Sequence, residues 1–599
     1  MLWSDVEEVD EMTRFAETSL VAVPWPTVPT QSSEDPIVRR TIDDNPHLFQ
    51  VNTPIKIDVL YHELRAHPNR EHVESVLRGL REGAWPFANK PESYPESYNY
   101  YAGAGARRRK PEHDAFLEQQ VKIEQAEGHL SEGFEELLDG MYCVPTHVVP
   151  KPHTNKFRQV SDHSGGDYPL NGMIPKSEGH ITLDGLRPLG QEILNMRNLY
   201  PNEELTLFKS DVKAAFRNIP LAPEFQIFQI MMVGLLFFVD WCVLFGSRGS
   251  PRIWCEFFAL VVWLTEIAFE KRGVGRKLFA WMDDTYGVVL KRLEERYEPY
   301  DLVMPAAQVT MLRLWDKIGL PHEKSKQIFG QQLTIIGFEV DVVSLSIRLP
   351  SSSRLLFIES TRAFIDTMKP RLSSWLQKIG YINWILNVFP WGKPALSPLY
   401  EKVRGKEISN TKVFNNDSVR AHLTWFLKHF EASSGVFLIT SLDWGPTEAD
   451  LTIFSDASLL GLGWYGVERT AGLWCGLPPN PTKSIILFFE LYAAALAINW
   501  AVSLRDRPKK IVLYTDSENT AQLFSSLRAK EWYNDLLMNC ATLVLTYGID
   551  LRVIWIPGTE NVVADALSRL DFHKARMHAP SINIMQYTPP TDFMEAWSK

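Results

Sequence analysis

The sequence predicts a multidomain α/β protein, and three observations support this fold class. With 599 residues, the chain can form about three to five domains. In its middle part, a strand–turn–strand pattern with acidic residues at the turn covers residues 277–290. Towards the C-terminus, strand-like segments alternate with Ala- and Leu-rich, helix-like segments, which indicates a sheet covered by helices.

Residues 281–284 read Trp-Met-Asp-Asp and lie between the apolar-leaning residues 277–280 and 285–290. This pattern predicts a hairpin with Asp283 and Asp284 at its tip. Two carboxylates at the end of a buried hairpin repel each other and are costly to desolvate. A bound divalent cation is the usual compensation, and a solvated loop tip is the alternative.

A second acidic residue at the end of a predicted strand favours a bound cation over a solvated loop tip. An apolar run ends in Asp211, and the aromatic Phe216 follows five residues later. A strand ending in Asp211 beside the hairpin could hold two Mg²⁺ ions about 3.5–4 Å apart, which is the geometry for in-line phosphoryl transfer. One ion would activate a 3′-hydroxyl and the other would stabilise the leaving pyrophosphate.

These residues resemble motifs A and C of reverse transcriptases, and further motifs follow in the family's order. Residues 246–251 (GSRGSP) are similar to motif B, 319–326 to motif D, 335–341 to the primer-grip hairpin and 148–158 to the fingers hairpin. The resemblance implies a right-hand polymerase with fingers, thumb and an α+β palm built on an antiparallel sheet. It also implies that Asp211, Asp283, Asp284 and the Val212 carbonyl bind two Mg²⁺ ions, with Mn²⁺ as the alternative ion.

The resemblance further implies a set of residues that contact the nucleotide or the template. They are Lys151, Arg158, Phe216, Gly249, Ser250, Pro251 and Lys324. We expect the Phe216 ring to lie against the sugar of the incoming nucleotide and to repel a ribose 2′-OH; a plain core aromatic is the alternative. Phe245 departs from the family, because some members carry Gln there. The nucleotide affinity and fidelity of those members therefore cannot be assigned to this chain.

The C-terminal part contains a second set of carboxylates. Asp456 lies near the end of a predicted strand (451–458), Glu490 in a predicted helix (488–500), Asp516 after a strand and Asp565 on a helix. An isolated Asp after a strand is usually a helix cap, which is the alternative for Asp516. The order of all four resembles the α/β ribonuclease H fold, and residues 556–569 (IPGTENVVADALSR) closely resemble the end of such domains in retroelement polyproteins. This implies a second two-metal site, for phosphodiester hydrolysis.

Together the two resemblances imply an RNA-directed DNA polymerase with ribonuclease H activity. Its partners would be an RNA template, a DNA primer, dNTPs and the RNA–DNA hybrid, in which only one strand carries 2′-hydroxyls. One alternative is a domesticated or inactive nucleic-acid-binding scaffold that retains both folds; the seven acidic residues at the expected positions argue against it. Another is a polymerase with a silent nuclease, because Thr559 occupies a loop position at which many ribonucleases H carry His.

Three further stretches resemble DIRS-like retrotransposons, as found in fungi, more than retroviruses. They are residues 67–86, residues 140–150, and residues 161–166 together with 169–171. This implies a role in retrotransposon replication, and an oligomer or other retroelement proteins stay open as further partners.

The expected domain order has five parts. They are an N-terminal, partly flexible region (1–110), fingers and palm (111–345), a helical thumb and connection (346–444), a ribonuclease H-like domain (445–572) and a tail (573–599). The acidic first 60 residues are expected to form a flexible or peripheral arm. The mostly basic residues 362–406 fit a thumb that grips a duplex backbone, with a solvated helical face as the alternative.

Charge and composition limit which ligands, cysteine chemistry and cellular compartment we expect for the protein. The net charge of −10 is unfavourable for nucleic-acid binding, although many of the acidic residues lie in the first 60 residues. Five widely spaced cysteines without a CxxC predict neither a disulfide framework nor a zinc knuckle. With an acidic N-terminus that does not resemble a signal peptide, this predicts an intracellular protein, cytoplasmic, nuclear or both. We interpret the apolar residues 227–245 as two strands turned at Gly234, not as a membrane span.

Overall fold

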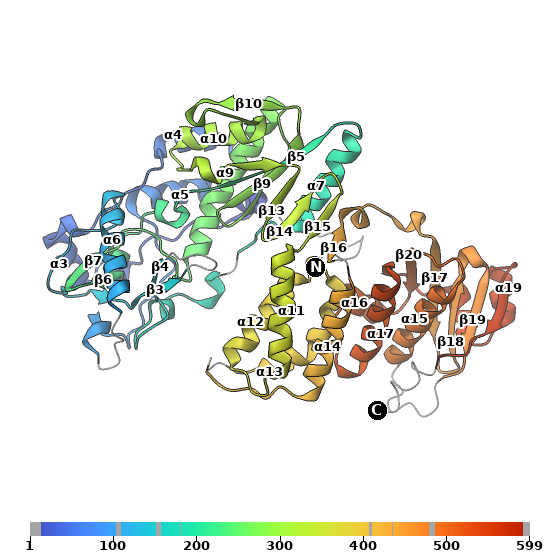
Figure 1. The fold of residues 1–599 in the computed structure, drawn as a ribbon. Helices are drawn as coiled ribbons and strands as arrows, with labels where there is room; N and C mark the ends of the chain where they lie inside the picture. Colours follow the sequence, from blue (N-terminus) through green and yellow to red (C-terminus); the bar gives the residue numbers. More distant parts are fainter. Residues whose placement is uncertain are drawn as a thin grey trace. The chain divides into compact units, whose positions relative to one another are not determined.

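The computed structural model describes residues 14–103, 110–150, 157–179, 181–406, 410–433, 435–477 and 486–590. These residues fall into two compact units, one within Met12–Leu333 and one within Thr334–Lys599. The mixed α/β multidomain fold is as predicted (Figure 1). The expected nucleotide or template contact of Lys151 lies outside the described residues.

The first unit is built around an antiparallel sheet in the order β12-β5-β9-β8, the palm sheet. Its strands are β12 (Ile328–Gly330), β5 (Leu205–Asp211), β9 (Asp284–Leu290) and β8 (Phe279–Trp281). Residues 205–208 of β5 and 285–290 of β9 are all buried, so these strands are covered along most of their length. Helices α9 (Ser250–Arg272) and α10 (Ala306–Ile318) supply much of the core of this unit, and α7 (Leu186–Leu199) packs against β9.

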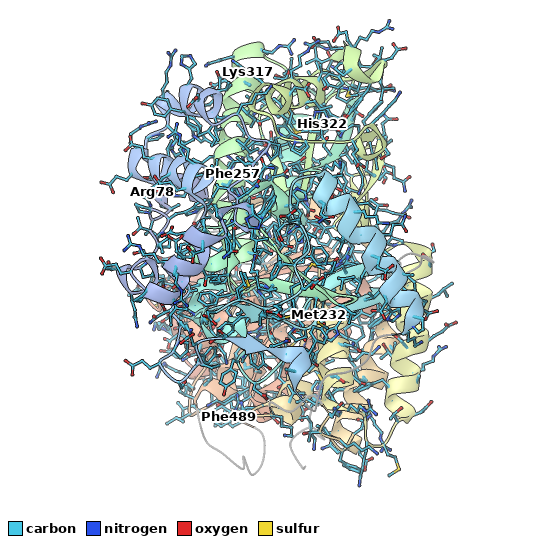
Figure 2. The ribbon with its side chains drawn as sticks, turned by 90° about the vertical axis from the view of Figure 1, so that its left-hand side faces the viewer. Arg78, Met232, Phe257, Lys317, His322 and Phe489 are labelled. Atoms are coloured by element: carbon cyan, nitrogen blue, oxygen red, sulfur yellow. The ribbon has the colours of Figure 1, made fainter. Side chains whose placement is uncertain are left out.

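Helix α9 begins at the end of the GSRGSP motif and covers the apolar stretch that follows it. Pro251 lies in its first turn, where a missing N–H costs nothing, and Gly273 ends it in the left-handed conformation with φ 63°. The helix is apolar on most sides because it is buried: Phe257 has no exposed surface and lies inside this unit, whereas Arg78 and Lys317 lie at its margin (Figure 2).

A second sheet of this unit has the order β1-β2-β6-β7. It consists of β1 (Tyr98–Asn99), β2 (Tyr142–Cys143), β6 (Ile230–Val233) and β7 (Leu236–Val239). Strands β6 and β7 are antiparallel and turn at Gly234, whose φ is 60°. The strand interpretation of this apolar stretch is therefore confirmed, although the strands are shorter than expected. Two hairpins complete the unit, β3 (Thr146–Pro150) with β4 (Phe157–Ser161) and β10 (Glu294–Tyr297) with β11 (Leu302–Pro305).

The acidic N-terminal segment is not peripheral, and the expectation of an arm is wrong for its described part. It forms α1 (Phe15–Val21), α2 (Thr30–Ser33), α3 (Pro36–Asp44), α4 (Ile57–Glu63) and α5 (Arg70–Glu82). Phe15 and Trp25 are buried in the same core as α9. A few large apolar side chains among many acidic ones are enough to anchor the segment, because each buries about 150–250 Å². Helices α6 (Pro111–Ala126) and α8 (Pro223–Gln226) follow.

The second unit starts within β13 (Gln332–Ile335) and has two parts. The first combines the strands β14 (Phe338–Asp341), β15 (Ser346–Arg348) and β16 (Val436–Leu438) with the helices α11 (Ser351–Asp366), α12 (Leu372–Ile385), α13 (Ser397–Val403) and α14 (Asp417–Ala432). Helices α11 and α14 meet through Phe357, Phe426 and Phe430, whose rings lie 5.3–5.9 Å apart. Because α11–α14 surround such an aromatic core, this part is a helical bundle.

The second part is a six-stranded sheet in the order β21-β20-β17-β18-β19-β22. Its strands are β17 (Leu451–Ala457), β18 (Leu462–Gly466), β19 (Ala471–Cys475), β20 (Lys510–Thr515), β21 (Asp550–Trp555) and β22 (Asn583–Gln586). Strands β17, β20 and β21 are parallel, and β18 is antiparallel to both β17 and β19. The helices are α15 (Ile486–Ser503), α16 (Glu518–Ser526), α17 (Glu531–Tyr547), α18 (Val562–Ser568) and α19 (Phe572–His578). We refer to this part as the ribonuclease H-like domain, after the resemblance of its sequence.

Helix α15 is the one described helix that is long and apolar enough to cross a membrane, and most of its residues are buried in the core of its own unit. All five cysteines are buried as well. Burial raises the pKa of Cys475 and of Cys540 to about 12, so both are protonated at neutral pH.

Candidate active sites

The palm sheet brings the three predicted carboxylates of the first unit together. Asp211 is the last residue of β5 and is the register partner of Asp284, the first residue of β9. Asp283 lies in the β8–β9 turn, and its carbonyl accepts a hydrogen bond from Val212 N at 3.3 Å. The turn requires a left-handed Met282, with φ 59°, a conformation that is unfavourable for a non-glycine residue.

The electrostatics of this palm site are those of crowded carboxylates. Burial, followed by repulsion from Asp211 and Asp284, raises the pKa of Asp283 to about 6. Two lysines offset part of the charge: Lys326 Nζ lies 2.6 Å from Asp211 Oδ2, and Lys209 Nζ lies 2.8 Å from Asp284 Oδ2. A cluster of hard oxygen donors that attracts cations fits divalent metal ions.

A pocket of about 400 Å³ opens at these carboxylates. Asp211, Val212, Asp283, Lys326 and Arg158 line it. Sequence reasoning placed Lys324 at this site, but Lys324 is exposed and is not among the pocket residues, whereas Lys326 from the same turn is. Only the geometry of the 3₁₀ turn Lys324–Lys326 distinguishes the two lysines.

Phe216 does not lie on the pocket wall. It is 4% exposed, and its ring packs against that of Phe245 with the centroids 4.5 Å apart. Phe245 is 49% exposed and lines the pocket, and the Arg158 guanidinium lies 5.9 Å from its ring centroid. The position at which some reverse transcriptases carry Gln therefore forms an exposed aromatic surface in the pocket.

The three motif B residues support the helix behind the pocket and do not line it. Gly249 precedes α9, and a Cβ at this position would lie 2.8 Å from the Pro86 carbonyl oxygen. Ser250 is buried at the first position of the helix, followed by Pro251. They fix where α9 begins.

A buried charge cluster, which sequence reasoning missed, supports the floor of the pocket. Arg217 Nη1 lies 2.6 Å from Asp240 Oδ1, and Arg217 Nη2 lies 2.9 Å from Glu124 Oε2. Removing one member would leave a buried charge unpaired. The cluster fixes the turn that contains Phe216.

The ribonuclease H-like domain holds a second group of carboxylates, the nuclease site. Asp456 on β17, Glu490 on α15 and Asp516 after β20 place their oxygens within 4.8 Å of one another. Burial and neighbouring carboxylates raise the pKa of Asp456 to about 7 and that of Glu490 to about 9. Glu490 Oε2 is buried and has no hydrogen-bond partner among the described residues. An orphaned buried oxygen in a crowded acidic group fits a metal ion.

Asp565 lies beside this group and is paired with cations. Its Oδ1 is 2.5 Å from Arg569 Nε, and its Oδ2 is 3.0 Å from Lys574 Nζ. Ser568, three residues further along α18, donates a hydrogen bond to the Asp456 carboxylate. The structure thus places all four predicted acidic residues at one end of the sheet.

The loop after β21 approaches the nuclease site closely. A Cβ on Gly558 would lie 3.0 Å from Asp516 Oδ2, and the next residue, Thr559, is exposed. Trp555 is 44% exposed and donates its indole N–H to the Asp516 carbonyl at 3.2 Å. Asp456, Glu490 and Asp516 thus converge in a chain that carries Thr559 at this loop position.

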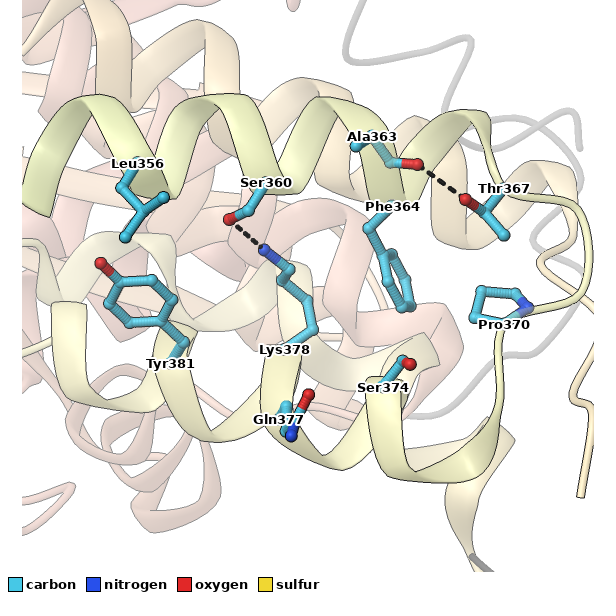
Figure 3. Close-up of a pocket in the computed structure, with 10 residues that line it drawn as sticks. All are labelled: Leu356, Ser360, Ala363, Phe364, Thr367, Pro370, Ser374, Gln377, Lys378 and Tyr381. Atoms are coloured by element: carbon cyan, nitrogen blue, oxygen red, sulfur yellow. Dashed lines mark hydrogen bonds between the residues drawn. The ribbon is translucent and has the colours of Figure 1, made fainter. Parts of the chain in front are cut away.

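The helical bundle departs from the basic surface expected of residues 362–406. Lys378 is buried between α11 and α12, and its ammonium donates to the Ser360 hydroxyl at 2.9 Å (Figure 3). Lys393 is buried too. Burial lowers the pKa of both lysines to about 8. Two of the expected surface cations are thus interior groups.

No protein-family model and no curated protein matches the sequence. The solved structures to which the chain is similar include three of a foamy viral protease-reverse transcriptase. The foamy viral protease-reverse transcriptase dRH in complex with double-stranded DNA is 15% identical, with a TM-score of 0.39 over 86% of this chain and 85% of that chain. The foamy viral protease-reverse transcriptase with an RNA/DNA hybrid is 13% identical, with a TM-score of 0.38 over 90% and 62%. The same protein with double-stranded DNA is 13% identical, with a TM-score of 0.36 over 93% and 98%.

Proposed function

We propose that the chain is an RNA-directed DNA polymerase with ribonuclease H activity that serves replication of a DIRS-like retrotransposon. The observation that carries this proposal is that one chain contains two separate sets of converging carboxylates. One set lies at the end of β5 and the start of β9 in the palm sheet, and the other lies at the ends of β17 and β20 in the ribonuclease H-like domain, with Glu490 of α15 beside them. The substrates would be an RNA template, a DNA primer, dNTPs and the resulting RNA–DNA hybrid.

Each carboxylate set would hold two Mg²⁺ ions, with Mn²⁺ as the alternative. Asp211, Asp283, Asp284 and the Val212 carbonyl would bind one pair; Asp456, Glu490, Asp516 and Asp565 would bind the other. Bound ions of this kind stabilise the charge that develops on phosphoryl oxygens.

The side chains around the palm site have roles of their own. Lys326 and Lys209 balance Asp211 and Asp284, so the carboxylates stay close together before substrate enters. Arg158 and Lys326 place positive charge along the pocket, where the phosphates of a nucleotide would be attracted. Phe245 would contact the sugar or base of that nucleotide through its exposed ring.

The test is primer extension on an RNA template with a DNA primer, in Mg²⁺ and in Mn²⁺, beside degradation of a labelled RNA–DNA hybrid. We expect Asp283→Asn to lose extension and keep hybrid degradation, and Asp516→Asn to show the reverse. Extension without hybrid degradation by the wild type would support the silent nuclease. Absence of both activities, with hybrid binding retained, would overturn the proposal in favour of a scaffold.

A further inference from the structure

Strand β8 carries the catalytic turn and lies at the edge of the palm sheet. Its inner side pairs with β9, so its outward backbone groups need partners from elsewhere. Asp184 supplies two of them: its Oδ2 accepts Ala280 N–H at 3.0 Å, and its backbone N–H donates to the Ala280 carbonyl at 3.0 Å. Glu266 on α9 holds the residue just before the strand, since its Oε1 accepts Leu278 N–H at 2.9 Å. Two carboxylates therefore fix the strand that ends two residues before Asp283.

Both carboxylates are held in turn by the start of the N-terminal segment. Phe15 N–H donates to Asp184 Oδ1 at 3.0 Å. The Arg14 guanidinium forms a two-pronged pair with Glu266, at 2.6 Å and 3.0 Å. Arg14 and Glu266 each have 16% of the side chain exposed, and Phe15 is fully buried. A bidentate pair of this kind is directional as well as strong.

We propose that Arg14 and Phe15, through Glu266 and Asp184, act as an N-terminal brace that positions Asp283 and Asp284. They are positioning residues, since none of them lines the pocket. The proposal rests on the polymerase function proposed above, and it assigns a role to a segment that lies more than 190 residues before the first palm carboxylate in sequence.

The geometry explains why the turn needs such support. Strand β8 has three residues, and Met282 is held in the left-handed region, which persists only when surrounding contacts determine it. From the other side, Trp254 Nε1 donates to the Met282 carbonyl at 3.1 Å. If the outer contacts of β8 are lost, the carboxylates are free to shift, and a shift of about 1 Å at a reacting centre costs on the order of 100-fold in rate.

The variants are Arg14→Ala, which removes both hydrogen bonds to Glu266, and Arg14→Lys, which retains a charge and one of them. Arg40→Ala is the matched control, because Arg40 forms an exposed pair with Asp139 at 2.9 Å in the same unit. We expect Arg14→Ala to lower kcat for primer extension by about 10- to 100-fold, with the KM for dNTP unchanged and more Mg²⁺ needed for half-maximal rate. Arg14→Lys should restore part of kcat, and Arg40→Ala should match the wild type.

Hybrid degradation by the same samples reports the amount of folded chain, because the nuclease site lies in the other unit. Equal losses of both activities, or a lowered melting temperature with kcat unchanged, would overturn the brace. Hydrogen exchange at the Leu278 and Ala280 amides gives a readout that does not need activity. If the wild type extends no primer, the polymerase proposal fails; faster exchange at these amides in Arg14→Ala would still support the brace, and unchanged exchange would overturn it.

Discussion

The ammonium group of Lys326 lies 2.6 Å from the Asp211 carboxylate, where β5 ends at the palm site. The hydrogen bond to Asp211 raises the pKa of Lys326, so this lysine stays charged at neutral pH. It lines the same pocket as Asp283 and Arg158.

Lys326→Met should therefore impair primer extension more than Lys324→Met does. A hydrogen bond to a charged group contributes about 1.5–3 kcal/mol, which corresponds to a loss of about 10- to 100-fold in kcat/KM. Lys324 is exposed and outside the pocket, so its replacement should change the rate less than about twofold. If Lys324→Met impairs extension more than Lys326→Met in steady-state assays, Lys324 is the lysine that contacts the nucleotide or template, as the sequence predicted.

Phe245→Ala should relax discrimination against ribonucleotides. The exposed ring of Phe245 covers Phe216, so Phe245 is the aromatic group that an incoming sugar would meet. We expect the ratio of ribonucleotide to deoxyribonucleotide incorporation to rise about tenfold, or about 1.4 kcal/mol of lost discrimination. Phe216→Val should mainly cost stability, by cavity formation. If Phe216→Val changes the incorporation ratio and Phe245→Ala does not, then Phe216 is the residue that discriminates against ribonucleotides.

Glu490→Gln should stabilise the metal-free protein at alkaline pH while abolishing hybrid degradation. The pKa of Glu490 is raised from 4.5 to about 9 by burial and by Asp456 and Asp516. The folded state thus holds a proton that the unfolded state releases above pH 4.5. Stability of the metal-free wild type must then fall as pH rises from about 4.5 towards 9.

Thermal melting in EDTA between pH 5 and pH 9 measures this effect. The melting temperature of the variant should fall less steeply with pH than that of the wild type. Glu560→Gln, at an exposed position of the same domain, should melt as the wild type does. Parallel curves for Glu490→Gln and the wild type would show that Glu490 holds no extra proton.

Gly558→Ala should slow hybrid degradation without unfolding the domain. Its Cβ would lie 3.0 Å from Asp516 Oδ2, so the carboxylate would have to move away from its position beside Asp456 and Glu490. We expect a loss of about tenfold or more, on the scale found for small displacements of catalytic groups. Gly476→Ala is the control, since a Cβ there meets nothing within 4 Å. Equal cleavage rates for the two variants would contradict the prediction.

The elements that the sequence predicted well are those with local signals. The apolar helix α9, the β6–β7 turn at Gly234 and the strands that end near Asp211 and Asp456 all follow from patterns within a few residues. Pairing of β5 with β9, and of β17 with β20, then brings the acidic residues of each site together. Periodicity and motif order were sufficient there.

What the sequence did not reveal depends on long-range packing. Phe245 covers Phe216 from 29 residues away, and Arg14 reaches Glu266 across 252 residues. Lys326 and Lys324 have the same chemistry and differ only in the direction that a 3₁₀ turn gives them. Phe15 and Trp25 are buried although acidic residues surround them in sequence. The acidic composition of the segment as a whole does not reveal these few large apolar side chains.

The burial of all five cysteines makes the protein a convenient substrate for site-specific labelling. Thiol-reactive dyes need an accessible thiolate, so the native chain should react slowly and leave little background. A cysteine introduced at Leu235, which is 89% exposed, and another at Leu459, which is 72% exposed, would place one fluorophore on each unit. Changes in energy transfer between the two dyes would then report movement of one unit relative to the other when nucleic acid is added.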